Sequence, residues 1–149
     1  MLPVWSLMGN ENWCMSGYHA VSVLADAITK GVFSNVDEAL AAMVSTSTVP
    51  YYEGIADYMK LGYIPLDKSG TAASSTLEYA YDDWCISIFA EAMSDFETKA
   101  KYERFAKAYE FYFDKSTRFM RGLDSKGEWR TPFNPRASTH RSDDYCEGT

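Results

Sequence analysis

The chain has 149 residues, about the length of one domain. Hydrophobic residues make up 46% of the sequence and charged residues 23%, which excludes a disordered or low-complexity chain. The 14 basic and 21 acidic residues give a formal net charge of −7, which argues against a nucleic-acid-binding protein or a polybasic membrane module. Aromatic residues make up 15% of the chain, a content that suits either a large core or a surface that stacks on rings.

Targeting signals and cysteine usage exclude further classes. No apolar run approaches the roughly 18–20 residues of a membrane-spanning helix. Residues 1–5 lack the basic and hydrophobic regions of a signal peptide, so none is visible in this chain, which does not bear on the export of a longer parent protein. Cys14, Cys85 and Cys146 form no CxxC pair, which argues against a structural zinc site. We interpret them as buried thiols rather than as a disulfide or a nucleophile.

Apolar residues recur at helical spacing along most of the chain. Ser75 and Ser94 each precede a glutamate by three positions, which is the capping-box pattern of a helix start, and Asn35 has a related pattern. Gly31 and Gly62 stand where helices commonly end. We expect helices over about 16–30, 35–44, 51–61, 75–93 and 94–113. The fourth is apolar over most of its circumference, as buried helices are.

Beyond Asp114 the sequence changes to glycine, proline and turn residues. Phe119-Met120 and Trp129-Arg130 flank the turn-forming residues 125–127, which predicts a short hairpin within an irregular excursion near 115–135. Short connections between the helical segments indicate antiparallel helix pairs. The sequence therefore predicts an all-α fold with one small hairpin.

The densest group of functional side chains lies at Gly9–Cys14, before the first expected helix. Asn10, Glu11, Trp13 and Cys14 bring amide, carboxylate, indole and thiol groups together. Polar groups beside an aromatic platform are typical of a sugar-binding site. The alternative is that the asparagines satisfy a turn and Trp13 belongs to the core. On residue types alone, both interpretations stand equally.

The other titratable residues favour structural roles. Asp82-Asp83 lies within an apolar helical stretch, and a buried carboxylate must be paired, hydrogen-bonded or protonated, so we prefer structural satisfaction to ligand contact. We interpret His19 as a packing or hydrogen-bonding residue and His140 as a solvated one. Asp143-Asp144 is interpreted as a solvated loop pair, with calcium ligation as a lesser alternative.

Several motifs that follow one another along the chain resemble glycoside hydrolase family 92. The longest and most specific is Thr76–Cys85, with the sequence TLEYAYDDWC. The resemblance covers essentially the whole chain with natural spacing. The other motifs are Leu2-Pro3-Val4-Trp5, Gly9-Asn10-Glu11, Cys14-Met15, Gly17-Tyr18-His19, Gly62-Tyr63-Ile64-Pro65, Gly127-Glu128-Trp129 and Pro132-Phe133.

Family 92 enzymes are calcium-dependent, exo-acting α-mannosidases that work with inversion. The resemblance implies that the parent protein removes terminal α-linked mannose, with an α-1,2 linkage expected, from N-glycans or mannan. Glu147-Gly148-Thr149 matches the first three positions of the motif that carries the general acid, so the resemblance implies this role for Glu147. The general base belongs to a motif beyond residue 149. Calcium is expected in the parent enzyme, but we assign it no ligand in this chain.

The resemblance also implies a fold, an (α/α)6 toroid preceded by a β-sandwich domain. Residues 1–149 are then the N-terminal part of the catalytic domain and form about half of the toroid. The expected partners are a mannose-containing glycan and the missing portion of the catalytic domain, so the isolated chain is expected to be inactive. The parent enzyme is expected in the periplasm or outside the cell.

Two rival hypotheses stand beside the enzyme fragment. The first is a stand-alone helical module that binds a glycan or a protein without catalysis. The second is another (α/α)6 enzyme, either a different glycosidase or a polysaccharide lyase. An acidic chain suits a lyase poorly, because lyases use basic residues to bind uronates.

Overall fold

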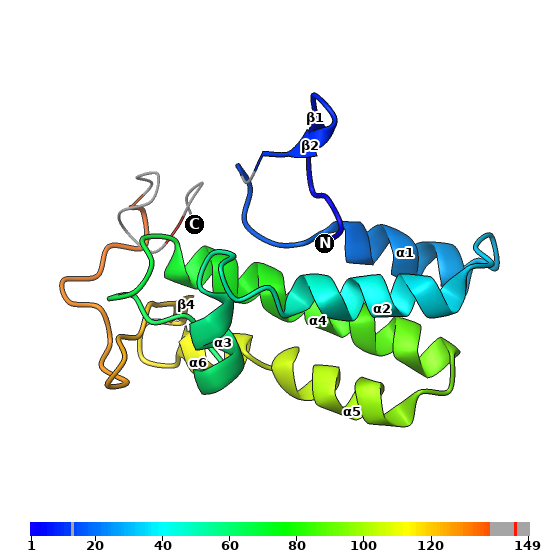
Figure 1. Cartoon of the computed structure of the whole chain (residues 1–149). Coiled ribbons are helices and arrows are strands. Elements are labelled where there is room, and N and C mark those ends of the chain that lie inside the picture. The colour runs from blue at the N-terminus through cyan, green and yellow to red at the C-terminus, as the bar shows by residue number, and fades with distance from the viewer. Residues whose placement is uncertain (13, 138–144, 146–149) are drawn as a thin grey trace. The chain divides into compact units, whose positions relative to one another are not determined.

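The computed structural model describes residues 1–12, 14–137 and 145, and its described part is mainly helical (Figure 1). The chain divides into two compact units. Unit 1 comprises Met1–Val49 and Glu78–Lys107, and unit 2 comprises Pro50–Leu77 and Ala108–Thr149. The all-α class predicted from the sequence is confirmed. Among the described residues, no helix combines the length and hydrophobicity needed to cross a membrane.

Unit 1 contains two antiparallel helix pairs. In the first pair, α1 (Ala20–Thr29) is followed by α2 (Val36–Ser47), and in the second the later part of α4 (Ala72–Ala92) is followed by α5 (Phe96–Phe105) (Figure 1). A short hairpin of β1 (Ser6–Leu7) and β2 (Asn10–Glu11) precedes α1. The core of this unit is formed by buried side chains of all four helices, among them Val21, Met43, Tyr79, Ile86, Phe89 and Tyr102.

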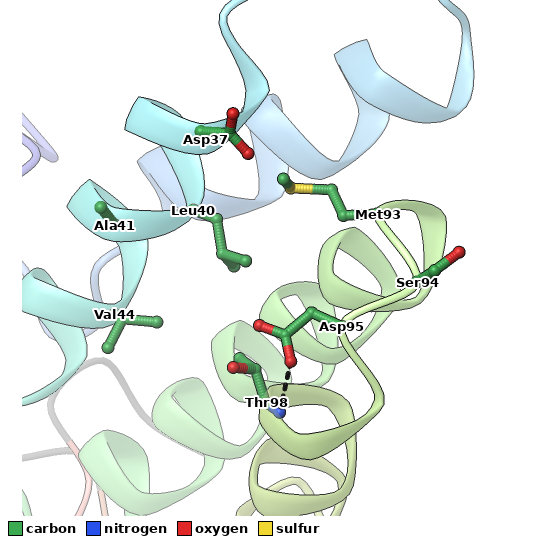
Figure 2. Close-up of a pocket in the computed structure, with 8 residues that line it drawn as sticks. All are labelled: Asp37, Leu40, Ala41, Val44, Met93, Ser94, Asp95 and Thr98. Carbon is green, nitrogen blue, oxygen red and sulfur yellow. Dashed lines mark hydrogen bonds between the residues drawn. The ribbon is translucent and has the colours of Figure 1, made fainter.

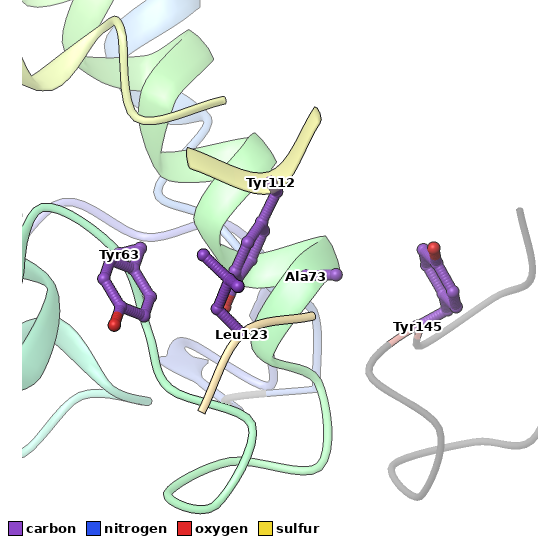
Figure 3. Close-up of a cluster of buried hydrophobic side chains, with 5 residues drawn as sticks. All are labelled: Tyr63, Ala73, Tyr112, Leu123 and Tyr145. Atoms are coloured by element: carbon purple, nitrogen blue, oxygen red, sulfur yellow. The ribbon is translucent and has the colours of Figure 1, made fainter. Parts of the chain in front are cut away.

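Unit 2 combines α3 (Ile55–Leu61), the first residues of α4, α6 (Tyr109–Tyr112) and a hairpin of β3 (Phe113–Asp114) and β4 (Phe119–Met120). The Tyr112 hydroxyl donates a hydrogen bond to the carbonyl of Ile64. The Tyr145 hydroxyl donates to the carbonyl of Met120. Figure 3 shows the buried hydrophobic cluster of this unit, formed by Tyr63, Ala73, Tyr112, Leu123 and Tyr145.

The first and fourth helices begin at positions other than those predicted. α1 begins at Ala20 rather than near residue 16, because Gly17 has a φ of +92°, outside the helical region. The amide nitrogen of Tyr18 donates to the side chain of Asp82. α4 begins at Ala72, so Ser75 lies inside the helix and its predicted capping box is wrong. The Ser75 hydroxyl instead bonds to the Thr71 hydroxyl at 3.0 Å, and Thr76 Oγ1 accepts from the amide of Ile64 at 3.0 Å.

The other helices also depart from their predicted limits. α2 continues through the Ser/Thr stretch to Ser47, because Thr46 Oγ1 donates to the carbonyl of Ala42 at 2.8 Å instead of breaking the helix. The third predicted helix is shorter, since α3 begins at Ile55. The fifth is interrupted after Phe105, and its cap is Asp95, which accepts from the amide of Thr98 at 3.0 Å.

The hairpins correct the prediction for the C-terminal excursion. Phe119-Met120 is a strand as predicted, but its partner is Phe113–Asp114 rather than residues 129–130. Trp129 forms only an isolated bridge with Leu123. The β1–β2 hairpin was missed, because its strands have two residues each and the signal is confined to its turn. There Met8 and Gly9 have φ values of 55° and 80°, which is the backbone of a tight hairpin turn.

Candidate functional site

The predicted sugar-binding segment starts on the β1–β2 hairpin. Asn10 is exposed on β2 beside Glu11, and Cys14 is exposed a few residues later. The carboxylate of Glu11 accepts hydrogen bonds from the main-chain amides of Val4, Trp5 and Asn12. Glu11 therefore has a structural role in holding the hairpin and the N-terminal residues together. Substrate binding by Asn10, Glu11 and Cys14 stays a prediction.

The remaining residues of the predicted site fall outside the described part of the chain. These are Trp13, at one end of the sugar-binding segment, and Glu147, the expected general acid. His140, Asp143 and Asp144 also lie outside it. Tyr145, two positions before Glu147 in the sequence, is buried in the hydrophobic cluster of unit 2.

The adjacent carboxylates of Asp82 and Asp83 are both buried and both hydrogen-bonded. Asp82 Oδ2 accepts from the main-chain amide of Tyr18 at 2.6 Å, and its other oxygen, Oδ1, lies 2.9 Å from Nδ1 of His19. Asp83 Oδ1 accepts from the Tyr18 hydroxyl at 2.6 Å. The prediction that these carboxylates are structurally satisfied is confirmed. Together they fix residues 17–19, where the chain enters α1, against α4.

His19 connects this buried group to the surface of unit 1. Its Nε2 atom lies 3.3 Å from Oε2 of Glu78, one helical turn before Asp82 on α4. The hydrogen bond with Asp82 raises the pKa of His19 above 6.5, against an opposing effect of burial. Burial raises the pKa of Asp82 above 3.8, while the bond with His19 works in the opposite direction. The imidazole is therefore held between two carboxylates.

Glu78 was missed as a partner of His19 by the sequence analysis, which assigned it to a capping box. The available signal was its spacing of four residues from Asp82, which places both carboxylates on one face of a helix. Gly17 was part of a sequence motif, but its structural role was not predicted. It has a φ of +92°, and a Cβ atom there would meet the His19 ring at 2.6 Å. Only glycine suits both the backbone angle and the space.

The prediction that all three cysteines are buried thiols holds for only one of the two described cysteines. Cys85 is buried, and burial raises the pKa of its thiol to about 11. A thiol with such a pKa is protonated at neutral pH and unreactive as a nucleophile. Cys14 is exposed, so the burial prediction is wrong for this residue. Its position after the exposed turn region accounts for the difference, while Cys146 lies outside the described residues.

Two grooves open on unit 1. One, of about 220 Å³, lies between α1 and α4 and is bordered by Ser22, Asp26, Tyr81 and Trp84. The other, of about 500 Å³, lies between α2 and the junction of α4 and α5 (Figure 2). Its lining includes Leu40, Val44, Met93 and Asp95. The first groove lies one helical turn beyond His19 and Glu78, neither of which lines it.

The described part of the chain does not by itself provide a complete calcium site. Calcium takes six to eight oxygen ligands, usually including several carboxylates. Among the described residues there is no group of three or more His, Cys, Asp and Glu side chains that could hold a metal ion. The buried carboxylates of Asp82 and Asp83 are engaged by Tyr18 and His19. No catalytic step is therefore derived through calcium.

Comparison with known families gives a match along the whole chain. The sequence profile of the glycosyl hydrolase family 92 catalytic domain matches residues 1–149. An uncharacterized secreted glycosidase of Arthroderma benhamiae is 28% identical over 132 residues, which are 77% of this chain and 17% of that protein.

Solved structures show the same similarity. A family GH92 α-mannosidase of Bacteroides thetaiotaomicron is 46% identical with a TM-score of 0.93, covering 99% of this chain and 20% of that one. Its complex with mannoimidazole has a TM-score of 0.94 at 45% identity over the same shares. An inverting GH92 mannosidase of the same species is 34% identical with a TM-score of 0.85, covering 95% of this chain and 21% of that one. The chain thus spans about a fifth of the solved structures it matches.

Proposed function

The chain belongs to glycoside hydrolase family 92, and from this premise we propose that it is part of an enzyme that removes terminal α-linked mannose with inversion. The observation that carries the proposal is the similarity, at 46% identity over 99% of the chain, to an α-mannosidase. The inverting mannosidase among the solved neighbours supports the stereochemistry. The substrates proposed are N-glycans or mannan, with α-1,2-linked mannose at the non-reducing end.

We propose that Glu147 is the general acid of this reaction. Its carboxyl group protonates the leaving glycosidic oxygen, which requires that the group stays protonated near neutral pH. A second carboxylate, supplied by the remainder of the enzyme, activates the attacking water. In an inverting enzyme the two carboxyl groups stand about 6.5–9.5 Å apart to admit that water. Asn10, Glu11, Trp13 and Cys14 are the proposed substrate-binding residues.

The proposal extends to the rest of the enzyme. Residues 1–149 constitute part of an (α/α)6 catalytic domain, whose missing portion is the chain's own partner and supplies the base. Calcium is proposed for the parent enzyme, and no residue of this chain is assigned as its ligand. A periplasmic or extracellular location is proposed for the parent, and the secreted glycosidase among the relatives supports it. Family membership favours this enzyme over a stand-alone binding module.

The experiment that tests the proposal transplants the chain into a working framework. Residues 1–149 replace the matching fifth of the Bacteroides α-mannosidase, and hydrolysis of an aryl α-mannoside is measured with calcium and after its removal by a chelator. We expect activity in the calcium-loaded chimaera, and loss of that activity on chelation. The isolated chain is expected to show no turnover. A folded chimaera without activity, or an isolated chain as active as an ordinary glycosidase, contradicts the proposal.

Glu147→Gln tests the role of the acid within the same chimaera. Loss of a general acid typically lowers kcat by about 10²–10⁴-fold. Glu103→Gln on α5 makes the same change of charge at an exposed position and is expected to leave kcat unchanged. A Glu147→Gln chimaera that retains full kcat contradicts the assignment of the acid, while leaving the family and the reaction in place.

A further inference from the structure

His19 and Glu78 form a polar pair on the surface of unit 1. His19 Nε2 lies 3.3 Å from Glu78 Oε2, and the two side chains are 34% and 46% exposed. One supplies an imidazole nitrogen and the other a carboxylate. The pair can therefore both donate and accept hydrogen bonds toward a ligand in solution.

The orientation of the imidazole is fixed from behind. Asp82, whose side chain is fully buried, places Oδ1 2.9 Å from Nδ1 of His19, so this nitrogen carries the proton and Nε2 lies on the side of Glu78. The ring occupies the space over Gly17, where a Cβ atom would stand 2.6 Å from the ring. A surface side chain held by a buried charged partner and a shaped backbone is pre-organised in the way that binding sites are.

Asp82 holds residues 17–19 in place, but the exposed contact between His19 and Glu78 adds little to stability. An exposed ion pair such as His19–Glu78 contributes only about 0–1 kcal/mol. Burial of the Asp82 carboxylate carries a desolvation cost, which raises its pKa. A costly buried group that orients a surface imidazole is the combination expected where the imidazole has a ligand.

Aromatic rings continue the surface from His19 along α4. The ring of Tyr81 lies 6.4 Å from the imidazole, and the ring of Trp84 lies 6.2 Å from that of Tyr81. Tyr81 and Trp84 are about half exposed. They border the groove of about 220 Å³ between α1 and α4, on whose other side stand Ser22 and Asp26.

Resting on the proposed function, we propose that His19 and Glu78 bind hydroxyl groups of a mannose ring that packs its C–H face against Tyr81. The hydroxyl groups accept from and donate to the imidazole and the carboxylate, as the protonation of His19 dictates. The aromatic face covers the apolar side of the pyranose. His19 and Glu78 are thus substrate-binding residues in addition to those of the N-terminal hairpin.

Histidine NMR tests this proposal on the chain itself. The sequence has two histidines, so the imidazole resonances of His19 are assigned by comparison with a His140→Gln variant. Methyl α-D-mannoside is titrated into the chain, and backbone amide dispersion confirms folding. We expect a saturable change in the His19 resonances and none in those of His140. In Glu78→Gln the dissociation constant is expected to rise about tenfold, equivalent to about 1.4 kcal/mol.

Matched variants separate the possible outcomes. Glu97→Gln on α5 makes the same change of charge at an exposed position and is expected to leave the dissociation constant unchanged. Tyr81→Leu removes the aromatic face, including its contact with the His19 ring, and leaves the His19 and Glu78 side chains in the chain. It is expected to weaken binding, so the test does not depend on one variant. An unresponsive His19 overturns the proposal, and so do Glu78→Gln and Tyr81→Leu variants that bind the mannoside as tightly as the parent chain.

Failure of the proposed site at His19 and Glu78 can be distinguished from failure of the proposed function. If the mannoside shifts the amides of Asn10 and Glu11 while His19 stays silent, the further site is overturned and the proposed substrate-binding segment is supported. If no resonance responds, the site at His19 is overturned. The proposed reaction is then tested only by the activity of the chimaera.

Discussion

The hydroxyl of Tyr18 donates a hydrogen bond to Oδ1 of Asp83 at 2.6 Å, and both side chains are buried. The ring of Tyr18 also stacks on Tyr79, with ring centroids 5.1 Å apart. Tyr18, two positions before α1, is therefore joined to α4 by a charged hydrogen bond and an aromatic contact. This connection holds the start of one helix pair of unit 1 against the other.

Tyr18→Phe is expected to destabilise the chain while keeping its ring. Removal of a hydrogen bond to a buried carboxylate costs about 1.5–3 kcal/mol in the free energy of unfolding, because Asp83 loses a donor that water cannot replace. Urea denaturation measures the change. Tyr109→Phe removes the hydroxyl of a 45% exposed tyrosine and is expected to stay within about 0.5 kcal/mol of the parent chain. Equal stability of the two variants would contradict this account of Asp83.

Gly17→Ala is expected to be more destabilising than Gly31→Ala. Both glycines have positive φ, +92° and +67°, so each alanine carries the left-handed backbone cost of about 1–2 kcal/mol. At Gly31 no atom lies within 4 Å of an added Cβ, whereas at Gly17 the His19 ring lies at 2.6 Å. Overpacking adds about 1–3 kcal/mol at Gly17. Thermal and urea unfolding of both variants measure the difference, and equal losses would show that the ring is not fixed there.

Stability is expected to depend on pH through His19. Its pKa in the folded chain is raised above 6.5, chiefly by the hydrogen bond with Asp82. The stabilisation by the imidazolium is therefore fully present below pH 6.5 and is lost as the pH rises through the higher folded-state value. Urea denaturation of the parent chain and of His19→Gln across this range measures the effect. The stability difference between them should shrink with rising pH, and a constant difference would contradict the raised pKa.

Sequence periodicity predicted the helical segments well, because each carries an apolar face that local spacing reveals. It misplaced their ends wherever a distant residue competes for the backbone. Tyr18 has helical spacing with Val21, but Gly17 before it has a φ of +92°, and the Tyr18 amide is bonded to Asp82, 64 residues away. Ser75 was expected to cap a helix, but it lies inside α4, and the hydroxyl of the next residue, Thr76, accepts from the amide of Ile64. Such long-range partners leave no periodic signal in the sequence.

The candidate site was predictable in composition but not in geometry. The apolar residues around Asp82 indicated that its carboxylate is buried. A buried carboxylate needs hydrogen-bonding partners, so such partners were expected. The sequence did not identify those partners, because Gly17, Tyr18 and His19 belong to a segment far away in the chain. Glu78 was misassigned for the same reason. Its spacing of three residues from Ser75 indicated a capping box, and nothing nearby in the sequence indicated that its partner is the distant His19.

The two described cysteines are expected to differ sharply in reactivity. Cys14 is exposed, whereas Cys85 is buried and its pKa is raised to about 11 by burial. In a Cys146→Ser variant, a thiol reagent at neutral pH should label Cys14 quickly and Cys85 only after denaturation. Peptide mapping by mass spectrometry identifies the labelled residue. Rapid labelling of Cys85 in the folded chain would contradict its burial between α1 and α4.

Asp114 is expected to make the chain sensitive to acid. Its carboxylate accepts from the Ser116 hydroxyl at 2.6 Å and the Ser116 amide at 2.8 Å, and it pairs with Arg121 at 3.0 Å. These contacts, the Ser116 hydroxyl foremost, hold the pKa of Asp114 below 3.8. The stabilisation is present above pH 3.8 and is lost as the pH falls through the lower folded-state value. Asp114→Asn should therefore destabilise the chain at neutral pH and flatten the acid limb of its stability curve.

Glu110→Gln, at an exposed position on α6, is the control for Asp114→Asn and should leave that limb unchanged. Circular dichroism along an acid titration measures both, and coincident curves for the parent chain and Asp114→Asn would refute the role of this carboxylate.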